Sequence, residues 1–248
     1  MIALKSKEQI DGIRKSCHLL HSLLEELHSF VKEGISTKAI DVYSEEFIRK
    51  HGGKPAFLHY EGFPATACVS VNDEVIHGIP SSHRIIQDGD LVKVDLGINL
   101  NGYFSDSAYS YEVGNVSEKV KKLNKITRES LYLGIDAINK SGARISDISR
   151  AIFMHNSKEG YGVVRDYCGH GVGLDIHEEP LIPNYVSPFQ NLRLKEGMVI
   201  AIEPMITIGT WKVHTLDNGW TVVTDDGSIA SHHEHTVAIT ENGPEILT

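Results

Sequence analysis

The sequence predicts an α+β fold built from two similar halves around one antiparallel sheet. Two observations indicate this arrangement. The predicted elements follow the order helix, helix, strands, and the same order then repeats. Apolar residues also occupy every second position of Leu91–Leu100, and Asn101-Gly102 follows directly, which is typical of an antiparallel hairpin. We expect a single catalytic domain over residues 1–248, with halves at about 1–115 and 116–248 that share a core.

Two helices open the chain. Apolar side chains recur every three or four residues over 7–31, which predicts an amphipathic helix with one buried face: Ile10, Ile13, Cys17, Leu20, Leu24 and Leu27. Residues 37–50 are expected to form the second helix. Ser36 is its candidate N-cap, and Gly52-Gly53 follows its end.

Strands and two further helices follow. A strand is expected at Ala67–Val71, and a type I′ turn at Asn101-Gly102 is expected to join Leu91–Leu100 to Tyr103–Val113. The second half begins with helices at about 117–140 and 146–158. Glycine-rich, strand-forming sequence then continues from residue 160, with expected strands at Met198–Ile202 and Ser231–Ile239.

Composition excludes several classes of protein. The 248 residues are 41% hydrophobic and 23% charged, as is ordinary for a globular chain. No run of about 18 apolar residues occurs and the N-terminus lacks the apolar segment of a signal peptide, so we expect neither a membrane span nor secretion. The formal net charge of -9 argues against a nucleic-acid binder. Three scattered cysteines indicate reduced thiols and a cytoplasmic location.

Two aspartates of the hairpin are expected to share one face. With a two-residue loop, Asp95 pairs with Ala108, and Gly97 pairs with Asp106. Since paired residues share a face, the two carboxylates are diagonal neighbours, with Cβ atoms roughly 7–8 Å apart. A divalent cation would relieve their repulsion, and oxygen ligands suit such ions. The alternative is a pair of solvated acids on an exposed face.

The second half supplies further candidate ligands. His170 and His177 lie in a segment whose glycines permit close backbone approach to a bound group. A neutral imidazole is a common ligand of borderline metals, although a single histidine is more often a structural hydrogen-bonding residue. Glu203 directly follows an expected buried strand. A carboxylate there is costly unless it is paired or binds metal, the alternative being a solvated strand end.

The segment near the C-terminus contains one more candidate. Glu234 and His235 point to opposite faces of the expected strand, so only one of them faces the site. By contrast, His232 and His233 are expected to be polar residues of an edge strand, without a role in the site.

Five potential ligands occur in a characteristic order: Asp95, Asp106, His170, Glu203 and Glu234. This order resembles the ligand set of the methionine aminopeptidase family, whose fold is the pita-bread fold. The resemblance covers essentially the whole chain and includes the segments Asn-Asp-Glu-Val-Ile-His77-Gly-Ile-Pro, Gly-His170-Gly-Val-Gly and His177-Glu-Glu-Pro. It implies a pseudo-twofold antiparallel sheet with two pairs of helices on its outer face.

The resemblance also implies the subtype and the metal ligands. The 31 positions from Glu203 to Glu234 are too few for the helical insertion of type II enzymes, so the chain is similar to the bacterial type I group. Asp95 is expected to bind one of two divalent ions. His170 and Glu203 are expected to bind the other, while Asp106 and Glu234 contact both. Mn, Fe, Co and Zn all suit such a set.

The implied reaction is the removal of the N-terminal methionine from nascent proteins whose second residue is small. A hydroxide that bridges the two ions attacks the first peptide carbonyl. His177 helps to stabilise the oxyanion, and Glu203 carries the proton to the leaving amine. His77 and His177 contact the substrate. Five side chains are expected to line the slot for methionine: Tyr60, Phe63, Cys68, Ile176 and Trp220.

Two other hypotheses stay open. One is an aminopeptidase of the same fold with a different first-residue preference. The other is a binding module without catalysis, although such proteins usually lose ligands and this chain retains all five. The expected partners are nascent polypeptide N-termini, with ribosome association left open. We expect a monomer that binds neither membranes nor specific nucleic acids.

Overall fold

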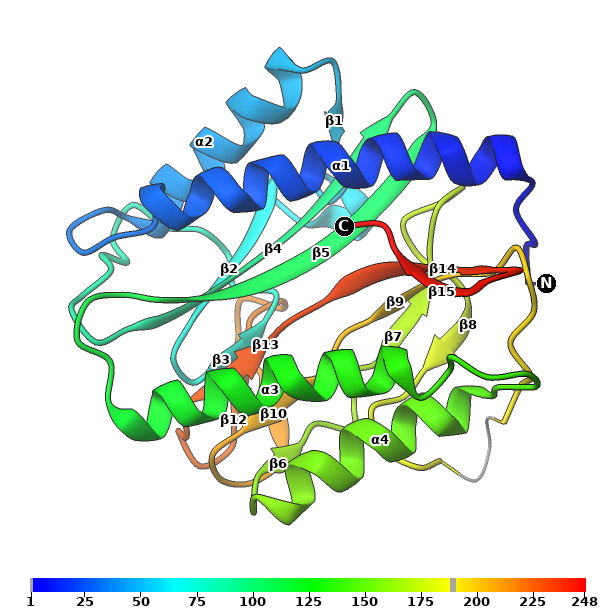
Figure 1. Ribbon diagram of the computed structural model, residues 1–248. Coiled ribbons are helices and arrows are strands. Elements are labelled where there is room, and N and C mark those ends of the chain that lie inside the picture. Colours follow the sequence, from blue (N-terminus) through cyan, green and yellow to red (C-terminus); the bar gives the residue numbers. More distant parts are fainter. Residues whose placement is uncertain (1, 188–190) are drawn as a thin grey trace.

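Helices and strands follow one another in two rounds, as predicted. The computed structural model describes residues 2–187 and 191–248 (Figure 1). Its helices are α1 (Lys7–Phe30), α2 (Thr37–Lys50), the short η1 (Tyr60–Gly62), α3 (Glu118–Asp136) and α4 (Ile145–Lys158). Its strands are β1 (Lys54–Pro55), β2 (Ala67–Val71), β3 (Glu74–Ile76), β4 (Leu91–Leu100), β5 (Tyr103–Glu112), β6 (Gly162–Val163), β7 (Gly169–Gly171), β8 (Glu178–Ile182), β9 (Val199–Ile202), β10 (Met205–Thr207), β11 (Val213–Thr215), β12 (Val222–Thr224), β13 (Ala230–His232), β14 (His235–Thr240) and β15 (Gly243–Ile246).

Serine side chains begin three of the helices. Ser6 accepts a hydrogen bond from the N–H of Gln9, Ser36 does the same for α2, and Ser117 for α3. These bonds satisfy backbone donors that have no partner within the helix. The third helix ends at Asp136, before the predicted 140, because the following residues continue only as tight turns up to Gly142, whose φ of +76° ends the helical path.

The central hairpin has the predicted register. Asn101 and Gly102 have φ values of 56° and 89°, the two positive angles of a type I′ turn. Asp95 accordingly pairs with Ala108, and Gly97 with Asp106. The opposite face of β4 is apolar and buried, which fixes this register against a slip of one residue.

The antiparallel strands are divided among four hydrogen-bonded sheets within the described residues. The two halves meet where β5 and β14 lie side by side between α1 and α3 (Figure 1). Side chains bridge this junction. Ser107 Oγ donates to the carbonyl of Glu234 at 2.7 Å, and Thr236 Oγ1 donates to the carbonyl of Asp106 at 2.8 Å. At this junction β5 and β14 are therefore joined mainly by side-chain bridges and do not form a continuous backbone ladder.

The expected strand Ser231–Ile239 is interrupted. β13 pairs with β10, β14 pairs with β9, and the chain crosses from one sheet to the other at His233 and Glu234. The backbone N–H of Glu234 instead donates to the carbonyl of Ala108 on β5, at 2.9 Å. This crossing directs the Glu234 side chain towards the aspartates of the hairpin.

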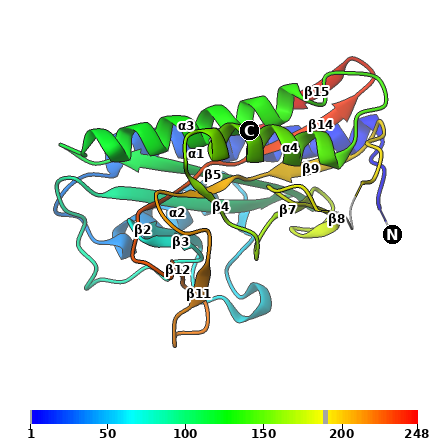
Figure 2. The same cartoon turned by 90° about the horizontal axis from the view of Figure 1, so that it is seen from below.

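Apolar packing holds each pair of helices against its own strands. In the first half, α1 and α2 pack on β2 and β4; in the second, α3 and α4 pack on β8, β9 and β14. Ile10, Ile13 and Cys17 of α1 also pack on Val172 and Val199 of the second half. In Figure 2, α1, α3 and α4 lie on one side of the strands, whereas β11 and β12 lie on the other.

Candidate metal centre

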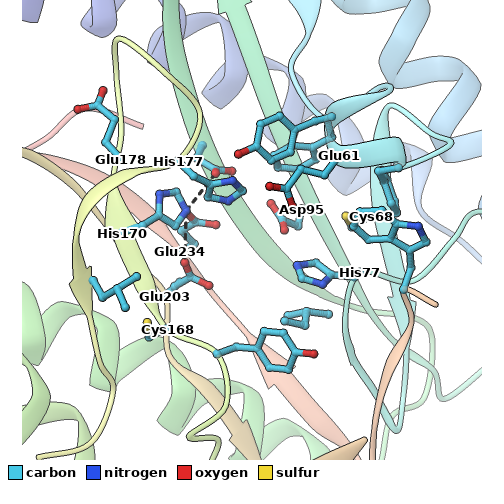
Figure 3. Close-up of a pocket in the computed structure, with 18 of the residues that line it drawn as sticks. Glu61, Cys68, His77, Asp95, Cys168, His170, His177, Glu178, Glu203 and Glu234 are labelled. Atoms are coloured by element: carbon cyan, nitrogen blue, oxygen red, sulfur yellow. Dashed lines mark ion pairs between the residues drawn. The ribbon is translucent and has the colours of Figure 1, made fainter. Parts of the chain in front are cut away.

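One cavity collects nearly all the predicted site residues. It has a volume of about 470 Å³, and its walls include Tyr60, Phe63, Cys68, His77, Asp95, Asp106, His170, His177, Glu203, Trp220 and Glu234. These residues come from both halves of the chain. In Figure 3, His170, Glu203 and Glu234 lie close together on one side of the cavity, while Cys68 and His77 lie on the other.

Four carboxylates converge at the base of this cavity. Asp106, Glu203 and Glu234 are 3%, 9% and 3% exposed, and Asp95 is partly buried beside them. The hairpin register supplies the two aspartates, the end of β9 supplies Glu203, and the crossing before β14 supplies Glu234. No described lysine or arginine forms an ion pair with any of the four. So much buried negative charge requires another source of positive charge.

His170 is oriented as a neutral ligand. Its Nδ1 donates to the carbonyl oxygen of Gly171 at 2.9 Å, which leaves the lone pair of Nε2 free. Nε2 lies 3.5 Å from Oδ2 of Asp106 and 3.6 Å from Oε1 of Glu203. Burial lowers the pKa of His170 to about 3, so the ring is neutral near pH 7 and cannot itself neutralise these carboxylates.

The donor atoms fit divalent metal ions. Asp95 Oδ1, Asp106 Oδ1 and Glu234 Oε1 are buried oxygens without a hydrogen-bond partner. Three groups have donor atoms within 4.8 Å of one another: Asp95, Asp106 and Glu234; His170, Glu203 and Glu234; and Asp106, His170 and His177. Two atoms that bind one ion at about 2.1 Å lie roughly 3–4 Å apart, which matches the separations around His170. A mixed oxygen and nitrogen set of this kind suits borderline metals.

Without metal, the carboxylates hold protons more tightly than usual. Burial raises the pKa of Asp95 to about 7. Burial and the neighbouring carboxylates of Glu234 and Asp95 raise the pKa of Asp106, and burial and Glu203 raise that of Glu234. A cation that binds here must therefore displace protons.

Metal binding is therefore expected to release protons and to weaken as the pH falls. Each proton displaced should lower the metal affinity about tenfold per pH unit below the pKa of its carboxylate. Titration calorimetry of the metal-free protein with Mn²⁺ at pH 7, in two buffers of different ionisation enthalpy, measures the number released. Identical heats in both buffers would mean that the carboxylates are already ionised without metal.

Histidines and aromatic rings form the upper walls of the cavity. The ring of His177 lies 4.3 Å from that of His170 and 5.1 Å from that of Tyr60, centroid to centroid. Phe63 and Trp220 meet edge to face at 5.1 Å. Tyr60, Phe63, Trp220 and Cys68 make an apolar wall beside the carboxylates. Such a combination can hold an apolar group next to a charged reaction centre.

The cavity differs from the prediction in a few residues. Ile176 is fully buried and packs behind the wall, against the apolar cluster of Phe57 and Phe63, without lining the cavity. Tyr167 and Cys168 do line it. They directly precede β7, the strand that carries His170. Their position next to a predicted ligand in the sequence could have identified them as cavity residues.

The prediction for His232 and His233 was wrong about their exposure. His232 does end β13, an edge strand of its sheet, but both side chains are buried, at 1% and 2% exposure. His233 points towards α3, where its Nε2 lies 2.7 Å from Oδ1 of Asn124. His232 points the opposite way, and its Nε2 lies 3.7 Å from Oε2 of Glu203. The crossing between two sheets covers this segment on both sides.

The fold and the carboxylate–histidine cluster together define a metal-dependent hydrolase. The model of metallopeptidase family M24 matches residues 11–241. A methionine aminopeptidase of Treponema pallidum is 52% identical over 100% of this chain and 96% of its own length. Methionine aminopeptidase 1 of Bacillus subtilis is 49% identical over 100% of this chain and 99% of its own. The crystal structure of a methionine aminopeptidase from Thermotoga maritima is similar at a TM-score of 0.97 and 42% identity, covering 100% of this chain and 99% of that one.

These matches cover all of this chain and at least 96% of each relative. Their sequence identities of 42–52% are higher than a shared fold alone would explain. The chain belongs to metallopeptidase family M24.

Proposed function

We propose that this enzyme removes the N-terminal methionine from newly made proteins whose second residue is small. One observation carries the proposal: the carboxylate–histidine cluster and an apolar aromatic wall border the same cavity. The T. pallidum and B. subtilis relatives, which are methionine aminopeptidases, support the choice of methionine.

The proposed cofactor is a pair of divalent ions, Mn, Fe, Co or Zn. Asp95 would hold one ion, and His170 and Glu203 the other. Asp106 and Glu234 would contact both, which fits their deep burial and unpartnered oxygens. When bound, such ions acidify water and polarise a carbonyl oxygen.

The protein's own side chains would then orient the peptide and move its protons. His177 stands at the mouth of the cavity beside the His170 ring, where it can donate to the carbonyl oxygen of the first peptide bond. Glu203, buried at the base, passes a proton to the leaving amine. His77 lies on the opposite wall (Figure 3), where it would hold the amide beyond the scissile bond.

The apolar wall would select the first residue. The proposed slot contains Tyr60, Phe63, Cys68 and Trp220, with Ile176 packed behind it. Methionine suits such a slot because its thioether is flexible and packs well against aromatic rings. The second residue would lie near His177, and the preference for a small one there is part of the family resemblance.

Peptides that begin Met-Ala, Met-Gly or Met-Ser should therefore be cleaved, and those that begin Met-Leu, Met-Lys or Met-Glu should not. We expect kcat/KM for Met-Ala peptides to exceed that for Met-Lys peptides by about 10²-fold or more. Product release from both peptides, with Mn- or Co-loaded protein, measures the ratio. A Leu-Ala peptide tests the first-residue preference in the same assay. Equal rates on Met-Ala and Met-Lys would contradict the proposed substrate.

The proposal includes the cellular location, the oligomeric state and the partners of the enzyme. A cytoplasmic monomer that meets nascent chains, with or without contact with the ribosome, fits the reduced cysteines and the net charge of -9. The same charge disfavours binding to specific nucleic acids. None of the described helices is long and apolar enough to cross a membrane.

A further inference from the structure

A buried histidine outside the predicted site lies against one of its carboxylates. His232 is 1% exposed, and neither of its ring nitrogens has a hydrogen-bond partner. Unpartnered polar atoms are costly in a protein interior, so a buried imidazole without partners needs an explanation. Oε2 of Glu203 lies 3.7 Å from Nε2 of His232.

The fold fixes this neighbour firmly. In the ladder of β10 with β13, His232 pairs with Met205, which follows Glu203 after a single proline. Ser110 of β5 holds the backbone of His232 on both sides: its Oγ accepts from the N–H at 3.0 Å and donates to the carbonyl at 2.7 Å. These bonds fix the backbone of His232, and so the base of its side chain, beside Glu203.

The two oxygens of Glu203 face two different histidines. Oε1 lies 3.6 Å from Nε2 of His170, on the side of the metal cluster, and Oε2 faces His232. A small rotation of either side chain would bring the second contact within hydrogen-bond distance. We propose that His232 is a positioning residue whose Nε2–H holds Oε2 of Glu203, so that Oε1 is presented to the metal and the substrate. The inference rests on the proposed function.

The chemistry of the ring agrees with this role. The imidazole of His232 is buried, and a neutral imidazole carries one N–H that can donate to a carboxylate oxygen. A neutral donor fixes the carboxylate without cancelling its charge. Partners that orient a metal ligand in this way typically contribute 10–100-fold to metal affinity or activity.

Substitutions that keep or remove the donor test the proposal. His232→Leu should lower kcat for a Met-Ala peptide, or weaken Mn²⁺ binding measured by calorimetry, about 10–100-fold, with little change in KM. His232→Gln retains an N–H and should recover most of the loss. An equal loss in both variants, or no loss in His232→Leu, would overturn the proposal.

The adjacent residue provides a matched control. His233 is equally buried but contacts Asn124 on the helix side, so His233→Leu should cost stability and leave kcat near wild type once the protein is folded. A loss of kcat as large as that of His232→Leu would mean general damage, and would also overturn the proposal.

A spectroscopic measurement covers the case in which His232→Leu fails to fold. In the zinc-loaded wild type, NMR should show a slowly exchanging Nε2–H signal that disappears in His232→Gln and shifts in Glu203→Gln. A His232 ring protonated only at Nδ1 would contradict the assignment. This measurement also separates the two proposals, since a protein inactive on Met-Ala peptides could still show the signal.

Discussion

Asp106→Asn should strip the protein of most of its bound metal, whereas His177→Ala should leave the metal content near wild type. Asp106 is 3% exposed, and one of its carboxylate oxygens has no other partner. It also occurs in two of the three donor groups. An asparagine removes one negative charge and replaces one oxygen ligand by a nitrogen that carries hydrogens and cannot bind a cation.

The effect on activity should be correspondingly large. Metal ions contribute several kcal/mol to the stabilisation of a hydrolytic transition state. Since each 1.36 kcal/mol corresponds to a factor of ten, the loss in kcat/KM should be about 10³-fold or more. Elemental analysis after dialysis measures the metal, and circular dichroism shows whether the fold is intact.

His177 could also be a metal ligand on geometric grounds, so the comparison of the two variants can contradict the proposed roles. His177 has a donor atom within 4.8 Å of donors of Asp106 and His170, although its side chain is exposed. If His177→Ala lost as much metal as Asp106→Asn, His177 would be a ligand, and its proposed role at the substrate carbonyl would have to be given up.

The hairpin and the early helices could be predicted because their determinants are local. Two residues, Asn101 and Gly102, set the turn, and the turn sets every pair of the ladder. The register then places Asp95 and Asp106 on one face. Likewise α2 begins after its serine cap and ends before two glycines, as the sequence indicated.

The crossing before β14 could not be predicted in the same way. The local sequence of residues 231–239 does not reveal that the first part pairs with β10 and the second with β9. That choice depends on contacts with β5, more than a hundred residues earlier in the chain. The burial of His232 and His233 follows from the crossing, so a local pattern assigned both to an exposed edge.

The glycines around His170 were recognised, but their partner was not. A Cβ on Gly169 would lie 2.2 Å from the carbonyl oxygen of Ala201, and one on Gly171 would lie 2.4 Å from that of Glu179. The close approach is therefore to neighbouring strands and not to a bound group. Glycine at these positions lets β7 fit between β8 and β9, which fixes the backbone that carries His170.

Substitution of His77 tests whether a residue outside the metal ligands contacts the substrate. This histidine follows β3 with a φ of 57°, an uncommon angle for a residue with a side chain. Such conformations are often found at functional sites, where the surrounding structure compensates for the strain. The ring stands edge-on to Tyr167 at 5.6 Å and to Trp220 at 6.3 Å, on the wall opposite Glu203.

The His77 ring is neutral under assay conditions. Burial, together with His177 across the cavity, lowers its pKa to about 4. A neutral imidazole still donates one N–H, so its hydrogen bond to the substrate should not depend on pH between 6 and 8. A contact that strengthens as the tetrahedral intermediate forms acts mainly on kcat.

His77→Ala should therefore keep its metal and its fold but lose about 10²–10³-fold in kcat, the usual cost of one such donor, with a smaller change in KM. Steady-state kinetics on a Met-Ala peptide, metal analysis and circular dichroism measure the three quantities. His83→Ala, an exposed histidine in the loop after β3 that lies outside the cavity, is the control and should behave as wild type. Full metal with near-normal kcat would make His77 a structural loop residue. Loss of metal would make it a ligand, because no change in substrate contact alone could release the ions.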